Sequence, residues 1–325
     1  MPEQFRQATS ETLPTLQEQF LRESLPAQFN TQIASLRNVG LLESILKEST
    51  PADDELVIEL QEGITGMDGR PYPLPTVEEI AKHFSQEKYA EKISQGFTKL
   101  LIVPFAYPLA TICARYEQAL LKHHKAGKLL DRDGTLLILD TKRPLYFLKF
   151  LNKSDETGDM IYYPKQFDTE NHGGFTKQEL LTPVTQEAKF NSPFLGFHIL
   201  LIKPDLTIPR KGMTQTTGGR ADLESVKSPN NYLYTIQTNS FYNHEQGMTL
   251  EDSLILALTN LHETNRVIDD FENIKDSVNF NIGVFHKASG HVPISYWFLT
   301  LGRADIDMRD PKSSYEDSGC RVAVS

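Results

Sequence analysis

Cysteine and tryptophan are scarce in this chain. Its 325 residues include two cysteines, Cys113 and Cys320, and one tryptophan, Trp297. Two cysteines so far apart form neither the framework of a disulfide-rich domain nor the paired spacing of a zinc site. The sequence therefore identifies no metal site. The fold must be stabilised by packing, and a chain of this length buries roughly three-quarters of its unfolded surface.

Positive charge and long apolar runs are lacking as well. The chain has 33 basic and 43 acidic residues, a net charge of −10. Such a surface repels phosphate backbones, so we expect no nucleic-acid partner. Apolar runs such as residues 100–106 are too short to span a bilayer, and the first residues lack the pattern of a signal peptide. We expect a soluble, cytoplasmic protein with no membrane partner.

Hydrophobic periodicity predicts both helices and strands. Thr76 with Glu79, and Thr249 with Asp252, form capping pairs that open two helices. Short apolar runs at 99–103 and 197–202 are typical of buried strands, and both end in Leu-Leu-Ile-x-Pro. The shared ending is compatible with a duplicated unit, but we favour two ordinary buried strands, each stopped by proline. Further strands are predicted at 136–139, 145–151, 231–238, 280–285 and 292–299, and further helices at 16–23 and from Pro108 to Gly127.

These elements predict the α+β class. We expect a mixed sheet with packed helices, and a C-terminal β-rich module with one inserted helix. We divide the chain into a loosely ordered segment (1–25), an N-terminal α/β region (26–190) and a C-terminal α+β module (191–325).

The C-terminal module carries several features in a defined order. They are the strand His198–Ile202, Pro209, the loop Gly218-Gly219-Arg220, a strand at 232–236, the helix start Gly247-Met-Thr-Leu-Glu251, the run Gly290-His-Val-Pro293, Trp297, and a tail with Cys320 and Arg321. In this order they resemble an uncharacterised bacterial family of domains of unknown function, found mainly in actinobacteria, over about residues 194–322. That family places its tryptophan one residue nearer to the Val-Pro pair and has further tryptophans in its tail. The resemblance implies a fold and no chemistry.

Four side chains of this module are candidates for binding a ligand: Arg220, His291, Trp297 and Arg303. The choice rests on residue type and on the resemblance. Glycines free the backbone amides of a loop and arginine adds a fork of donors, so Gly218-Gly219-Arg220 has the composition of an anion-binding loop. The same residues are typical of a flexible loop, and a tryptophan between Tyr296 and Phe298 is typical of a core.

One motif points to an enzyme. Asp131-Arg-Asp-Gly-Thr135 resembles the opening motif of haloacid-dehalogenase-type phosphatases, in which the first Asp is the nucleophile, the second a general acid or base, and Mg²⁺ lies beside them. Such an enzyme also needs a Ser or Thr, a Lys and a late acidic pair, and Thr141, Lys142 and Asp269-Asp270 are the candidates for these roles. The motif follows a helix end rather than a long buried strand, however, and Asp-x-Asp-Gly is ordinary turn chemistry. We favour the turn.

The residues thus support two functions from different classes. We interpret the chain as a module that binds a small ligand or a protein partner. A Mg²⁺-dependent phosphatase using Asp131 and Asp133 is the alternative, and Mg²⁺ is a cofactor only under that alternative. Cys320 with His291 and Asp305 is a third set by residue type, and it needs neighbours that lower the pKa of the thiol. The sequence does not decide whether the protein is an enzyme.

Overall fold

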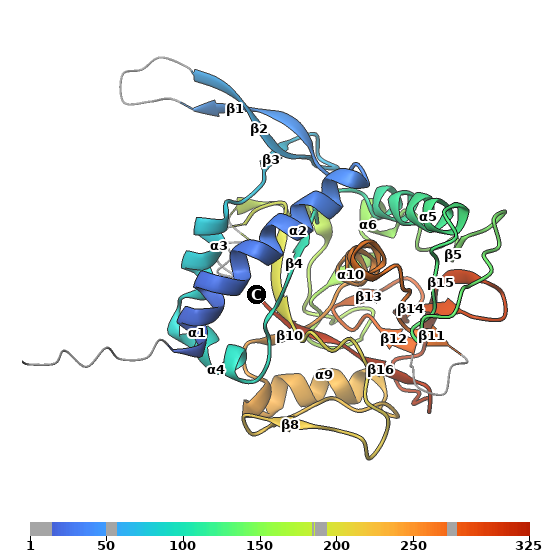
Figure 1. Cartoon of the computed structure of the whole chain (residues 1–325). Helices are drawn as coiled ribbons and strands as arrows, with labels where there is room; N and C mark the ends of the chain where they lie inside the picture. Colours follow the sequence, from blue (N-terminus) through green and yellow to red (C-terminus); the bar gives the residue numbers. More distant parts are fainter. Residues whose placement is uncertain (1–14, 50–56, 184, 186–193, 272–277) are drawn as a thin grey trace, which may run out of the picture.

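A computed structural model describes residues 15–49, 57–183, 185, 194–271 and 278–325. From Leu16 the chain is helical, through α1 (Leu16–Gln19), a π-helical turn (Phe20–Ser24) and α2 (Leu25–Asn38). Residues 1–14 of the segment predicted to be loosely ordered lie outside the described residues. A three-stranded sheet follows, made of β1 (Glu43–Ser49), β2 (Val57–Thr65) and β3 (Pro71–Pro73), and its β1–β2 hairpin projects from the body (Figure 1).

A buried four-stranded sheet joins the two halves of the chain. Its order is β10 (Glu245–Gly247), β17 (Val322–Val324), β7 (His198–Ile202) and β4 (Lys99–Val103). The two strands with the shared Leu-Leu-Ile ending are antiparallel neighbours, with Leu100 opposite Leu201 and Leu101 opposite Leu200. Apolar runs of this length suit them because both strands lie in the interior.

A second, mixed sheet also takes strands from both halves. Its order is β16 (Ser318–Cys320), β12 (Val278–Phe280), β14 (Val292–Phe298), β15 (Arg303–Arg309) and β5 (Leu145–Phe147), and β11 (Asp270–Phe271) pairs with β14. Two short pairs complete the strands: β6 (Met160–Tyr162) with β13 (Val284–His286), and β8 (Thr216–Thr217) with β9 (Arg220–Ala221). The division at residue 190 stays a prediction, and strands from both sides of it hydrogen-bond to one another.

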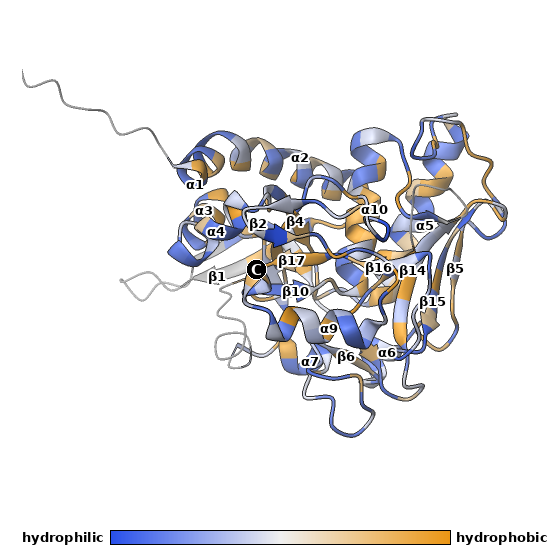
Figure 2. Cartoon of the chain, turned by 90° about the horizontal axis from the view of Figure 1, so that it is seen from below, coloured by the Kyte–Doolittle hydropathy of each residue, from blue (hydrophilic) through white to orange (hydrophobic). Residues whose placement is uncertain are grey.

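Helix α10 (Leu250–Thr264) lies at the centre of the fold. It is buried from Leu250 to Leu261, carries hydrophobic as well as hydrophilic segments in Figure 2, and packs against α2, α5 (Leu109–Lys125), β4 and β14. Its leucines and isoleucine suit such an interior position, and the polar side chains buried with them, among them Glu251 and Asp252, need partners inside the protein. Further helical segments of the described residues lie around this core: α3 (Val77–Phe84), α4 (Glu87–Ser94), α6 (Ser154–Thr157), α7 (Lys177–Leu180), α9 (Pro229–Thr238) and a 3₁₀ turn (Ser240–Tyr242). The predicted α+β class is confirmed.

Local sequence signals had mixed success. Both capping boxes form as predicted, Thr76 with Glu79 at α3 and Thr249 with Asp252 at α10. The strand predicted at 231–238 is wrong, because this stretch is α9. The Ser228 hydroxyl accepts a hydrogen bond from the Asn231 amide and Pro229 occupies the first turn, a start signal that the apparent alternation concealed. The strand predicted at 280–285 is interrupted, since β12 ends at Phe280 and β13 begins at Val284.

A buried histidine between α3 and α4 makes stability depend on pH. The Tyr89 hydroxyl lies 2.6 Å from Nε2 of His83, and burial, reinforced by the charge of Lys88, lowers the pKa of His83 to about 4. An unfolded chain binds a proton at this residue below a pH of about 6.5, whereas the native chain does so only near 4. The unfolded state therefore holds more protons in this window, and stability falls as pH falls.

We expect His83 to remove about 3 kcal/mol from the free energy of unfolding between pH 6.5 and 4. Urea denaturation across this range measures the loss. The matched control is His83→Gln, which keeps a partner for the Tyr89 hydroxyl and does not titrate. The wild-type curve must fall more steeply than that of the variant, and two parallel curves would contradict the assignment.

Candidate functional site

A cavity of about 610 Å³ lies where segments distant in the sequence meet. It is lined by the α4–β4 turn (95–97), the loop after β7 (202–215), the β8–β9 hairpin with the residues after it (217–223), the β16–β17 junction (320–322), and Arg132. Phe97, Ile202, Ile208, Leu223 and Val322 supply much of an apolar wall. The size and the apolar lining are those of a site for a small molecule.

The charged residues around this cavity are mostly basic. Five of them are cationic and two are carboxylates: Arg132, Lys203, Arg210, Arg220 and Arg321 against Asp205 and Asp222. Three more charged groups lie behind the wall: the carboxylates of Glu245 and Asp269 and the ammonium group of Lys92. When they are included, the positive charges around the cavity still outnumber the negative ones. This excess is local, since the whole chain carries a net charge of −10. The field in the cavity favours an anion.

Arg220 is held rigidly in one wall. Its Nε and Nη2 atoms each donate to the Glu245 carboxylate at 2.7 Å, and Nη1 donates to Asp222 Oδ1 at 2.9 Å. The guanidinium carbon lies 5.1 Å from the ring centre of Phe97 and 4.9 Å from that of Tyr242. Burial alone lowers the pKa of Arg220, and the hydrogen bonds and charge of Glu245 outweigh it, so the pKa is raised.

The Gly218-Gly219 pair positions Arg220. The two glycines are the central residues of the β8–β9 hairpin, in which Thr217 lies opposite Arg220. Both have positive φ, +57° and +79°, as a two-residue turn of this kind requires. The predicted loop is therefore a tight hairpin turn that aims the arginine at Glu245.

Arg321 forms a second fixed cation beside the cavity. It donates to both carboxylate oxygens of Asp269, at 2.7 Å from Nη1 to Oδ2, and its Nε donates to the Leu206 carbonyl at 3.0 Å. Arg132 donates to the Thr207 hydroxyl, so this arginine fastens the same loop from the other side. The sequence did not predict Arg132 and Arg321 as cavity residues, because no local motif indicates that they contact the loop after β7.

The four predicted ligand residues do not meet at this cavity. Arg220 lines it, and none of the other three does. Trp297 is buried in β14, while Arg303 begins β15 and pairs with Asp305 at 2.7 Å. His291 closes the β13–β14 turn opposite His286. The binding roles of His291, Trp297 and Arg303 stay predictions.

Cys320 lines the cavity, but the other two members of the cysteine set lie elsewhere. Burial raises the pKa of its thiol. β12 and β14 separate β16, which carries Cys320, from β15, which carries Asp305. Three strand spacings correspond to about 14 Å. The predicted set of Cys320, His291 and Asp305 is not brought together.

The Asp131–Thr135 motif forms a turn. Leu130 and Leu136 are bridged antiparallel, the Asp131 amide donates to the Thr135 carbonyl, and the Thr135 amide donates to Asp131 Oδ1 at 2.7 Å. The turn that we favoured from the sequence is present. Asp269, cast as an acidic partner under the phosphatase alternative, is engaged by Arg321. Among the described residues, no group of three or more His, Cys, Asp or Glu side chains is arranged to hold a metal ion.

A second group of charges is completely buried. Lys177 Nζ lies 2.9 Å from Asp155 Oδ2, 2.7 Å from Glu251 Oε1 and 3.0 Å from the Tyr107 carbonyl. The Tyr162 hydroxyl donates to the same Glu251 oxygen at 2.6 Å. Burial alone lowers the pKa of Lys177. The charges of Glu251 and Asp155 outweigh this effect, so the pKa is raised. This Lys177 cluster ties α6, α7 and β6 to α10.

Comparisons with known proteins add no relative. No family model, no curated protein and no solved structure matches the chain. The resemblance to the bacterial family of unknown function stays a prediction. Among the described residues, no helix is long and apolar enough to cross a membrane.

Proposed function

We propose that this protein binds a small acidic molecule with an apolar body in the cavity lined by Arg220. The observation that carries the proposal is the positive charge balance of a ligand-sized, largely apolar cavity in a strongly acidic chain. Arg220 and Arg321 are already fixed by Glu245 and Asp269. They supply positive potential without having to be ordered when the ligand binds, which lowers the cost of binding.

The location of Arg210 makes it the residue best suited to test anion recognition. It lines the cavity from the loop after β7. Its neighbour Lys211 carries the same charge and is exposed, and it is not among the lining residues. Arginine reads carboxylate and phosphate groups through two parallel hydrogen bonds, and a hydrogen bond to a charged group contributes about 1.5–3 kcal/mol.

Thermal-shift measurements with four matched probes test the ligand class: phenylacetate, phenyl phosphate, 2-phenylethanol and phenethylamine. We expect the two anions to raise the melting temperature, by the equivalent of about 2.7 kcal/mol at 100 times their dissociation constant. The neutral and cationic analogues must be weaker. Equal shifts by all four, or a preference for the amine, would contradict an anion site.

We expect Arg210→Gln to weaken binding of the better anion at least tenfold, because one charge-assisted contact is lost. Lys211→Gln should leave the affinity unchanged. Isothermal titration calorimetry of the wild type and both variants measures the difference. If the two substitutions lower the affinity equally, the loss of affinity reflects the positive electrostatic field of the loop as a whole and not a contact of Arg210 in the cavity.

A further inference from the structure

One edge of this acidic protein is basic. Residues 121–153 carry eight basic and three acidic residues, while the rest of the chain carries 25 basic and 40 acidic ones. The exposed lysines of this stretch are Lys122, Lys125, Lys128, Lys142, Lys149 and Lys153. Among the described residues, none of these six forms an ion pair. Their charges are therefore available to a partner. We call this stretch, together with Leu301, the basic edge.

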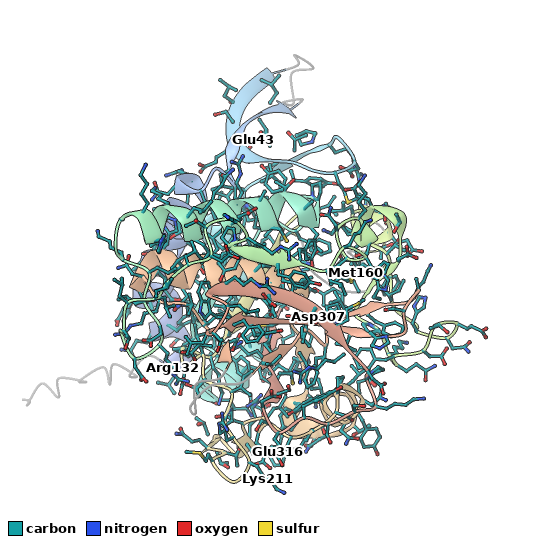
Figure 3. All side chains as sticks on the ribbon, turned by 90° about the vertical axis from the view of Figure 1, so that its right-hand side faces the viewer. Glu43, Arg132, Met160, Lys211, Asp307 and Glu316 are labelled. Atoms are coloured by element: carbon teal, nitrogen blue, oxygen red, sulfur yellow. The ribbon has the colours of Figure 1, made fainter. Side chains whose placement is uncertain are left out.

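The basic edge follows one margin of the mixed sheet. The Asp140 amide donates to the Gly302 carbonyl at 2.8 Å, β5 runs parallel to β15, and the Leu148 amide donates to the Ile306 carbonyl at 3.1 Å. Figure 3 looks onto this side of the molecule, with Asp307 of β15 near the centre and Arg132 to its lower left. The lysines from the end of α5 also complement its helix dipole. Those at 142, 149 and 153 have no such role.

Exposed apolar side chains stand among these cations. Leu136, Ile138 and Phe150 are 60%, 85% and 70% exposed, and Leu301 of the adjacent turn is 43% exposed. Three of the ten large hydrophobic side chains that the described residues expose thus fall in this one stretch. Leu137 and Leu139 are buried, so the extended backbone directs Leu136 and Ile138 outward. Scattered exposed leucines need no explanation, but three large apolar side chains exposed within one lysine-rich stretch do.

We propose that the basic edge binds the surface of an anionic lipid bilayer. Lysines near such a surface are attracted by its negative potential, and apolar side chains gain by entering the boundary between headgroups and acyl chains. Both needs are met on this one edge. A nucleic acid would use the charges and leave the aliphatic side chains without a partner. A protein interface is depleted in lysine and concentrates its apolar contacts at a packed centre.

This inference differs from the expectation, drawn from the shortness of the apolar runs and the lack of a signal-peptide pattern, that the protein has no membrane partner. The total charge conceals the separation of a basic edge from an acidic remainder. Arg132 belongs to the basic edge and also lines the cavity, so the surface and the cavity adjoin. Binding of the basic edge to a membrane does not depend on the small acidic ligand that we propose for the cavity.

Vesicle co-sedimentation tests the proposal on the full chain. We expect binding to vesicles of phosphatidylcholine mixed with phosphatidylglycerol, weaker binding at high salt, and little binding to phosphatidylcholine alone. No binding to the acidic vesicles would overturn the proposal. Binding to double-stranded DNA without binding to the vesicles would overturn it as well and would assign the edge to another polyanion.

Two sets of variants locate the contact. Lys142→Gln with Lys149→Gln should weaken vesicle binding roughly 25-fold, about fivefold for each lysine. Ile138→Ser with Phe150→Ser should weaken the binding that the wild type retains at high salt. Salt screens the attraction of the lysines, so the apolar contribution is what remains there. The matched control, Lys82→Gln with Lys312→Gln, removes two exposed lysines outside the basic edge, one on α3 and one next to Pro311, whose carbonyl accepts from the Asn230 amide in α9, and should bind like the wild type. Equal losses in the control and in the edge variants would overturn the assignment to this edge. Circular dichroism confirms that each variant is folded.

Discussion

We expect Lys177→Met to lower the free energy of unfolding by about 3–5 kcal/mol. Lys177, Asp155 and Glu251 all have relative exposures of 0%. Removal of the ammonium group leaves two carboxylates next to each other without their common partner. Breaking a buried ion pair from one side is costly, since the remaining charge can neither reach water nor be neutralised at no cost.

The hydrogen bonds of the Lys177 cluster strengthen this expectation. Asp155 Oδ1 and Glu251 Oε2 accept no hydrogen bond from the described protein atoms, even with Lys177 in place. The Leu109 amide donates to Asp155 Oδ2 at 2.7 Å, so the first turn of α5 depends on the same carboxylate. The cluster therefore has few remaining contacts that could take over the role of the lysine.

Urea denaturation measures the loss, with Lys312→Met as the control. Lys312 is exposed, and the same substitution there should change stability by less than about 0.5 kcal/mol. Adding Asp155→Asn and Glu251→Gln to Lys177→Met should recover part of the loss, because the buried charges are then gone. A single variant as stable as the wild type would show that the lysine is not needed to neutralise the carboxylates.

Local signals were predictable from the sequence, and the tertiary assembly of charges was not. The capping boxes at Thr76 and Thr249 are readable because all their partners lie within three residues. Lys177 looks like a surface lysine in the sequence, since its partners Asp155 and Glu251 lie 22 and 74 positions away. Only the packing of α7 against α10 and β6 reveals its burial.

The cavity illustrates the same limit. Arg220 could be singled out because two glycines precede it and make a tight turn. Lys92 and Glu245, which complete its surroundings, lie on α4 and β10 and carry no motif. The error at α9 has a different cause, because apolar residues at 232, 233 and 236 satisfy a helical period and were interpreted as a strand.

We expect Glu245→Gln to lower the free energy of unfolding by about 3–5 kcal/mol. The Glu245 carboxylate is the common partner of two buried cations, with Oε1 2.7 Å from Arg220 Nε and 2.9 Å from Lys92 Nζ. Glutamine has nearly the same shape but no charge, and one of its two terminal groups is a donor. The substitution therefore leaves a guanidinium and an ammonium group side by side, with Gln95 Oε1 and the Phe241 carbonyl as the remaining neutral acceptors of the lysine.

Glu263→Gln is the matched control. It is the same substitution, and it also removes the negative charge of a glutamate that pairs with a lysine, but at the surface. Glu263 lies 2.8 Å from Lys99, and the two side chains are 23% and 18% exposed. A pair that water can reach contributes no more than about 1 kcal/mol. Urea denaturation of both variants gives the comparison, and equal losses would contradict the role of burial. Glu245→Gln makes the surroundings of the cavity more positive, but it also releases Arg220 from its fixed position in the wall. We expect the loss of order to outweigh the added charge, so that phenylacetate or phenyl phosphate binds more weakly, whereas Glu263→Gln should leave binding unchanged. This second measurement separates a residue that only stabilises the fold from one that also shapes the site.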